Sequence, residues 1–175
     1  MKFYTAQAIG LIGMIIAFIS FQHNEKKKIL WTQAFGAVMF TLHFFLLGAF
    51  TGMIMNLLSI PRNLVFAVEH KKEKQLFFTI LFILLFIISG IFTWESPRSA
   101  FPISAMSLGT IVFSLKSPSV IRFCSLPISI FWLIYNIISI SYAGILTESF
   151  CFASIIIAIF RFNILKKPEL EKIEK

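Results

Sequence analysis

The sequence predicts an all-α membrane protein with seven transmembrane helices, arranged as two parallel triple-helix bundles joined by a linker helix. Three observations lead to this prediction. The chain is too apolar for a soluble domain, the connectors between its apolar segments alternate in charge, and its second half repeats the layout of its first. Hydrophobic residues form 58% of the chain and charged residues only 14%, whereas soluble domains have about 25% charged residues. Part of the surface must therefore face lipid.

A helix that crosses a bilayer needs about 20 mostly apolar residues, with roughly 17–25 tolerated. Seven segments meet or nearly meet this length, and the fifth is the shortest. They are Ala6–Phe21, Ile29–Gly48, Thr51–Val68, Leu76–Trp94, Phe101–Leu115, Ser119–Ile140 and Ala143–Phe162. No small-residue cleavage site ends the first segment, which predicts an uncleaved transmembrane helix rather than a signal peptide.

The connectors between these segments differ in charge in a regular way. Basic residues mark the first, third and fifth connectors and the C-terminal tail, through Lys26–Lys28, Lys71–Lys74, Lys116 and Lys166 onwards. The second and sixth connectors carry none, and the fourth carries only Arg98. Because Lys and Arg favour the cytoplasmic side, the N-terminus is predicted outside and the C-terminus inside, which requires an odd number of spans.

An internal repeat relates the two ends of the chain. When Gly52 is aligned with Gly144, Phe40 falls on Trp132 and His43 on Tyr135. Each half then has a basic connector, a long helix, a tight turn and a helix with a polar residue in its second turn. The predicted divisions are residues 1–70 for the first bundle, 71–97 for the linker helix, 98–165 for the second bundle and 166–175 for a charged cytoplasmic tail. Because the linker is a single transmembrane helix, the two repeats have the same orientation, as in one class of transporters.

Helical spacing gathers the polar residues of four segments onto one face each. The sixth segment carries Ser125, Ser129, Trp132, Asn136 and Ser139; the third carries Gly52, Asn56, Ser59 and Asn63; the second carries Gln33, Gly36, Phe40 and His43; the seventh carries Gly144, Glu148 and Cys151. Such faces serve close helix packing in membranes or line a solute pathway. The candidate binding residues are Asn56, Ser59, Arg62, Asn63, His43, Trp132, Asn136 and Glu148.

Two charged candidates are the hardest to explain as packing. Arg62 falls near the middle of its segment, where an isolated charge costs at least ~2.5–3.5 kcal/mol, unless it reaches the inner surface. Glu148 lies about one turn into the last segment. His43 is predicted at a similar depth, so a proton-linked pair of His43 and Glu148 is one hypothesis.

Three prolines, Pro61, Pro102 and Pro127, are predicted to interrupt helices and to act as hinges. Each removes one helical hydrogen bond and frees a carbonyl about one turn earlier. No nucleotide-binding, metal or catalytic motif accompanies them, so we expect no enzyme, no cofactor and no metal site. The net charge of +8 reflects membrane topology rather than nucleic-acid binding. Cys124 and Cys151 are expected to be free buried thiols.

Two stretches carry a family resemblance that spans most of the chain. FQHNEKKKILWTQAFGAVMFTLHFFLLGAFTGMIMNLLSIPRNLVFA is similar to the first half of the YgjV-type bacterial inner-membrane proteins, and WLIYNIISISYAGILTESF resembles their second half. That family looks related to the SWEET, SemiSWEET and PQ-loop transporters. The resemblance implies a bacterial inner-membrane location and a three-plus-one-plus-three bundle with proline hinges. It places Asn56, Asn136 and Trp132 near a central pocket.

The resemblance also has departures. The chain has no Pro-Gln dipeptide, and Glu148 stands where a second pocket asparagine is expected. We therefore expect a small polar solute, either a sugar or a charged metabolite, carried by alternating access between the bundles. The alternative is a non-transporting binding or assembly protein of the PQ-loop type. A transporter predicts a central cavity lined by Asn56, Arg62, Asn136 and Glu148, whereas a scaffold predicts these side chains paired in a dry bundle.

Overall fold

The fold consists of long antiparallel helices, as the hydropathy pattern predicts. A computed structural model describes residues 1–21, 26–68, 71–114 and 118–160, and within them the chain forms seven α-helices and one 3₁₀ turn. The helices are α1 (Lys2–Phe21), α2 (Lys26–Leu47), α3 (Phe50–Val68), α4 (Lys72–Phe92), α5 (Ala100–Ser114), α6 (Pro118–Ile138) and α7 (Tyr142–Ile159), with the 3₁₀ turn Pro97–Ser99 before α5. The prediction of an all-helical chain is confirmed. Lys116, His70 and the tail from 161 to 175 lie outside the described residues.

Four helices of the described chain are long and apolar enough to cross a membrane. They are α1 to α4, over Lys2–Ser20, Lys27–Leu47, Phe50–Val68 and Glu73–Phe92. Two further stretches, Phe123–Ile138 and Tyr142–Ile157, are apolar but shorter. At 15 residues, α5 is the shortest α-helix of the described chain, as its segment predicts. The outward surface is strongly apolar: Phe77, Ile91 and Phe92 of α4 are each more than half exposed, as a lipid-facing helix requires.

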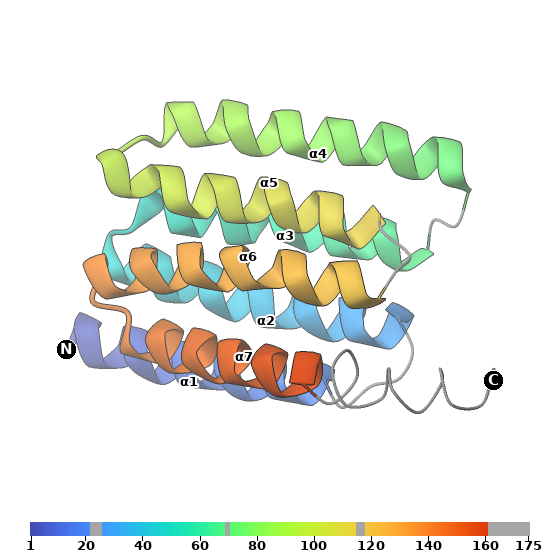
Figure 1. Cartoon of the computed structure of the whole chain (residues 1–175). Helices are drawn as coiled ribbons and strands as arrows, with labels where there is room; N and C mark the ends of the chain where they lie inside the picture. Colours follow the sequence, from blue (N-terminus) through green and yellow to red (C-terminus); the bar gives the residue numbers. More distant parts are fainter. Residues whose placement is uncertain (22–25, 69–70, 115–117, 161–175) are drawn as a thin grey trace.

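Six of these helices form a closed ring. Along the chain, α1 packs on α2, α2 on α3, α5 on α6 and α6 on α7, and contacts of α3 with α5 and of α1 with α7 close the ring. The remaining helix, α4, packs outside it against α3 and α5. Figure 1 shows successive helices running in opposite directions, so that α1, α3, α5 and α7 point the same way.

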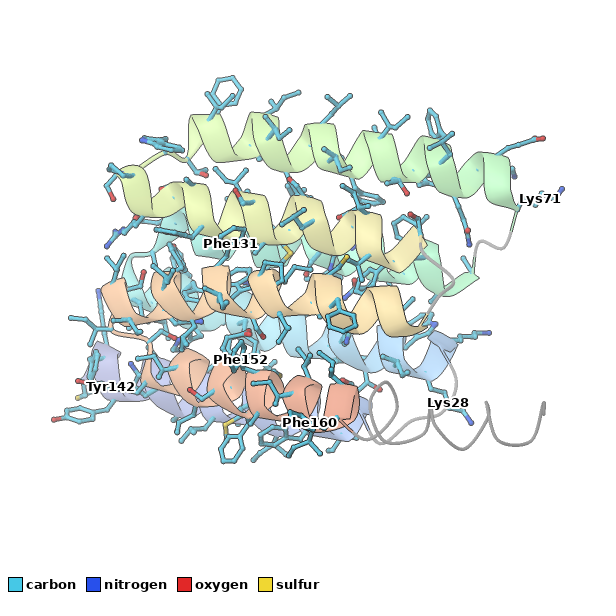
Figure 2. The ribbon with its side chains drawn as sticks, in the orientation of Figure 1. Lys28, Lys71, Phe131, Tyr142, Phe152 and Phe160 are labelled. Atoms are coloured by element: carbon cyan, nitrogen blue, oxygen red, sulfur yellow. The ribbon has the colours of Figure 1, made fainter. Side chains whose placement is uncertain are left out.

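The two ends of the bundle differ in their connections. At one end lie the turn after α2, the 3₁₀ turn and the turn after α6; we call this the turn end. At the other, the basic end, lie the exposed side chains of Lys28 and Lys71 (Figure 2), opposite Tyr142. Among the three connectors at the turn end only the one with the 3₁₀ turn carries a basic residue, Arg98, which agrees with the charge alternation of the sequence.

The turns after α2 and α6 have the same backbone structure. In the first, Gly48 adopts φ 70° and the N–H groups of Gly48 and Ala49 donate to Phe45 and Phe44 carbonyls. In the second, Ile140 adopts φ 53° and the N–H groups of Ile140 and Ser141 donate to Ile137 and Asn136 carbonyls. Both turns end a helix with a left-handed residue. They occupy corresponding places in the two predicted repeats.

Candidate functional site

The ring of six helices encloses a cavity of about 680 Å³. Residues of α1, α2, α3, α5, α6 and α7 line it, and no residue of α4 does. The cavity exists because α2 and α6 face each other across the ring while the neighbouring helices meet at its edges. Its volume falls in the range of small-molecule sites, which is about 300–1,000 Å³.

Most of the predicted site residues meet in this cavity. The lining includes seven of them: Asn56, Ser59, Arg62, Asn63, Trp132, Asn136 and Glu148. The polar faces of α2, α3, α6 and α7 thus turn toward one space, together with Gln33 and Cys151. None of the seven faces lipid; six are buried and Glu148 is half-buried.

Arg62 is a buried cation without an acidic partner. Its side chain is 5% exposed, and its Nε and Nη2 groups donate to Oδ1 of Asn63 at 3.2 and 3.0 Å. Its Nη1 group donates to Oγ1 of Thr110 at 3.3 Å and to the sulfur of Met106 at 3.4 Å. The guanidinium also lies 4.8 Å from the centre of the Phe113 ring. All these partners are uncharged, so the positive charge of Arg62 is not neutralised by the described chain.

Glu148 is the acidic counterpart in the same cavity, and it too has no oppositely charged partner among the described residues. Its Oε2 atom accepts a hydrogen bond from the Ser129 hydroxyl at 2.7 Å, which joins α7 to α6. Measured from the turn end at ~1.5 Å per residue, Glu148 lies about 9 Å along α7 and Arg62 about 18 Å along α3. The two charges therefore occupy different levels of the cavity.

Asn136 places an unpaired acceptor beside the acidic level. Its side chain is 2% exposed, and its Oδ1 atom has no hydrogen-bond partner among the described residues. The side chain lies against Gly144 of α7, where a Cβ atom would overlap Oδ1 and Cγ of Asn136. A glycine at 144 is therefore required for α7 to approach Asn136. A buried acceptor without a donor is unfavourable, and here Oδ1 is covered by the backbone of α7 at Gly144.

Asn56 and Ser59 are engaged mainly within their own helix. The Asn56 Nδ2 group donates to the Gly52 carbonyl at 2.9 Å, and the Ser59 hydroxyl donates to the Asn56 carbonyl at 2.7 Å. On the opposite wall, Trp132 of α6 stacks on Phe44 of α2 with ring centres 6.0 Å apart. These residues give the cavity polar and aromatic walls at the level of Glu148.

His43 does not line the cavity, and the structure does not pair it with Glu148. The histidine is fully buried. Its Nδ1 lies 2.7 Å from the Ala6 carbonyl oxygen, and its Nε2 lies 2.7 Å from the Ser141 hydroxyl. Both ring nitrogens thus serve contacts at the turn end, between α2, α1 and the start of α7. His43 was predicted to face the solute, but it is not among the residues that line the cavity, whereas Phe40 and Phe44, whose rings contact it, are.

Further contacts close the turn end of the ring. The Tyr135 hydroxyl accepts from the Gly52 N–H at 2.8 Å, and Gln7 of α1 donates to the Ile140 carbonyl and accepts from the Ala143 N–H. Toward the basic end, the lining reaches Ser20 and Phe113, in the last turns of α1 and α5. The cavity is thus sealed by hydrogen bonds at the turn end and extends toward the basic end.

The three predicted hinge prolines differ in position. Pro61 and Pro127 lie inside α3 and α6, so each removes a helical hydrogen bond as predicted. Pro102 lies in the first turn of α5, which begins at Ala100. The N–H group that a proline lacks has no helical partner in the first turn, so Pro102 does not interrupt its helix.

The residues of α5 that hold Arg62 were not among the candidates predicted from the sequence. Met106, Thr110 and Phe113 follow the i, i+4, i+7 spacing of one helix face, and this pattern could have revealed them. Thr147 also lines the cavity. It was not predicted, because it directly precedes Glu148 and so does not follow the helical spacing of the polar face of α7. Within the described chain, His, Cys, Asp and Glu side chains form no cluster of three or more that could hold a metal ion.

Comparison with known proteins identifies the family. The family model Imp-YgjV, described as "Bacterial inner membrane protein", matches residues 4–166 of this chain. The chain belongs to the Imp-YgjV family. This confirms the resemblance seen in the sequence and places the protein among bacterial inner-membrane proteins. None of the curated proteins and none of the solved structures matches the chain.

Proposed function

We propose that this Imp-YgjV protein transports a small polar solute across the bacterial inner membrane by alternating access, without catalysis, between two triple-helix bundles, α1–α3 and α5–α7. The observation that carries the proposal is the central cavity, in which Arg62 and Glu148 have no oppositely charged partner within the part of the chain that the structure describes. A scaffold would pair such groups, because an isolated charge within a membrane is costly. Charged groups left unpaired in a transmembrane cavity mark solute or ion pathways.

The helix arrangement supports two repeats of SWEET-like type. Both turns after the middle helices α2 and α6 have the same hydrogen bonds and a left-handed residue. The middle helices also make corresponding contacts: Tyr135 of α6 reaches the start of α3, and His43 of α2 reaches the start of α7. Parallel repeats about an axis along the membrane normal, with a site at their interface, are a known transporter plan. In this plan α4, outside the ring, is the linker.

The seal at the turn end supports an inward-facing state. We propose that the basic end is cytoplasmic, following the bias of Lys28 and Lys71, so that the N-terminus lies outside. The cavity then extends toward the cytoplasm, while the contacts of His43, Tyr135 and Gln7 close the outer side. Opening these contacts and closing the basic end would complete the transport cycle, with Pro61 and Pro127 as points where α3 and α6 can bend.

Labelling of a single cysteine tests this cycle without knowledge of the solute. In a Cys124→Ser, Cys151→Ser background, Asn56→Cys is exposed to a membrane-impermeant maleimide in right-side-out and in inside-out vesicles. A transporter labels from both sides, because the cavity opens to each in turn. Labelling from one side alone would overturn the proposal in favour of a binding or assembly protein. Leu57→Cys is the matched control. The Leu57 side chain, next to Asn56 in the chain, lies on the outer surface of the bundle, where lipid covers it, so a cysteine there should label from neither side.

Flux provides the direct test. Proteoliposomes with wild-type protein are expected to take up a labelled polar solute faster than empty liposomes, and Asn56→Ala is expected to slow that uptake. The control is Leu57→Ala, on the same helix turn but outside the cavity. Equal flux in the wild-type protein and in empty liposomes across neutral, anionic and zwitterionic solutes would contradict transport.

A further inference from the structure

We propose that the solute is a small zwitterion whose cationic nitrogen and carboxylate lie at opposite ends. This inference rests on the proposed function and names the substrate class of the same cavity. Its starting point is the number of charges: Arg62 and Glu148 line one cavity, and neither has an oppositely charged partner in the described chain. A zwitterion would supply each of them with an oppositely charged partner at once. A neutral sugar would neutralise neither.

The acidic level of the cavity suits a cationic nitrogen. Glu148 offers a carboxylate whose one hydrogen-bond partner in the described chain is the Ser129 hydroxyl. Trp132, whose ring stacks on Phe44, also lines this level, and aromatic rings attract cations. An ammonium group has donors but no acceptor, so it can satisfy these groups without leaving one of its own unpaired.

The basic level suits a carboxylate. Asn63, Met106 and Thr110 fix the Arg62 guanidinium in place without reducing its charge. A carboxylate would compete with these uncharged acceptors for the N–H groups of the guanidinium and would form the stronger, charge-assisted hydrogen bonds. The arginine is thus oriented before the solute arrives, and the ordering cost of binding is smaller.

The separation of the two levels determines the arrangement of charges within the solute. The backbone positions of Glu148 and Arg62 differ by about 9 Å along the helices at ~1.5 Å per residue. A solute with its charges on adjacent atoms would contact only one level. A linear solute with several carbons between nitrogen and carboxylate would contact both, and the apolar Phe40 and Phe44 lining would accommodate those carbons.

Binding can be measured with Trp132 as the reporter. The chain has three tryptophans, and Trp31 and Trp94 are exposed on the outer surface. In a Trp31→Phe, Trp94→Phe protein, the fluorescence of Trp132 therefore reports on the cavity. The probes are 5-aminopentanoate, pentanoate, pentylammonium and glucose, which differ in charge. We expect 5-aminopentanoate to bind at least tenfold tighter than each of the other three.

Two substitutions separate binding from a structural role, because they should change the preference for charge and not only the affinity. Arg62→Gln should weaken 5-aminopentanoate at least tenfold and shift the preference toward pentylammonium. Glu148→Gln should weaken it similarly and shift the preference toward pentanoate. Ser149→Ala, beside Glu148 but exposed, should change nothing. The comparison of probes on the reporter protein needs neither variant, so the test remains decisive if one of them fails to fold.

The outcomes distinguish this inference from the proposed function. Binding of glucose or pentanoate as tight as 5-aminopentanoate overturns the zwitterion, even if uptake into proteoliposomes establishes transport. Tight, selective binding of 5-aminopentanoate without flux keeps the ligand class and overturns transport.

Discussion

Tyr135 and Gly52 join the two halves of the chain through a hydrogen bond of 2.8 Å from the Gly52 N–H to the tyrosine hydroxyl. The bond depends on the absence of a side chain at 52, because a Cβ atom there would lie 2.6 Å from Cε1 of Tyr135. It also satisfies an N–H group in the first turn of α3, which has no helical partner. Close helix approach through glycine is the usual means of packing in membranes.

We therefore expect Gly52→Ala to destabilise the protein by about 1–3 kcal/mol, the usual cost of overpacking a well-filled site. The free energy of unfolding in detergent, measured by thermal or denaturant titration, checks this. Gly36→Ala is the matched control, since a Cβ atom there would meet nothing closer than 3.5 Å and alanine favours a helix. Equal stability of the two variants would show that α3 and α6 do not approach as described.

The turn after α6 contains a strained residue. Ile140 adopts φ 53°, a conformation that costs an L-residue with a side chain roughly 1–2 kcal/mol. Its side chain is exposed, so Ile140→Gly loses little buried surface. We expect this substitution to raise the free energy of unfolding by up to about 1 kcal/mol, after the entropy cost of glycine.

The corresponding turn offers the reverse experiment. Gly48 adopts φ 70°, and a Cβ atom there would meet nothing within 4 Å. Gly48→Ala therefore isolates the backbone cost and should lower stability by about 1 kcal/mol. If both substitutions change stability in the same direction, the two turns do not share one backbone conformation.

Arg62 should be dispensable for folding. No carboxylate contacts its guanidinium in the described chain, so Arg62→Met leaves no buried negative charge without a partner. We expect the free energy of unfolding to fall by less than about 1 kcal/mol or to rise, while solute binding is lost. A loss of stability above about 3 kcal/mol would indicate a structural arginine instead. Arg98→Met is the comparison, since Arg98 forms an ion pair with Glu95 near the surface.

The orientation in the membrane can be checked with two exposed positions at opposite ends of the bundle. In the same cysteine-free background, Tyr142→Cys at the turn end should react with an impermeant maleimide in intact spheroplasts. Glu73→Cys, near the start of α4, should react only after the membrane is permeabilised, because helix ends that carry Lys and Arg stay on the cytoplasmic side. The opposite pattern would reverse the proposed orientation and place the cavity on the outer side.

Much of the fold could be predicted from the sequence because a membrane imposes a strict length and hydropathy on each helix. The seven segments and the four inward faces follow from helical periodicity. Contacts between helices are harder to predict. Lipid-facing and helix-facing surfaces are both apolar, so hydropathy gives no sign of which helix leaves the ring, and it is α4 that packs outside.

The contacts that each polar residue makes could be learned only from the structure. Periodicity places His43 on the same side of its helix as Phe40, but only packing shows that His43 bonds Ala6 and Ser141 while Phe40 lines the cavity. Periodicity also cannot show which charged side chains form ion pairs. The partner belongs to another helix, and its height along the bundle depends on how the six helices pack in the ring.

The sequence by itself determined the helices, their inward faces and the family, since these depend on local pattern and composition. Only the tertiary structure decided that six helices enclose a cavity and that hydrogen bonds close the turn end. It also decided that Arg62 and Glu148 face the cavity with no oppositely charged partner among the described residues. The physical reason is that hydrogen bonds and charge pairs between helices depend on distances of a few ångströms between residues far apart in the chain.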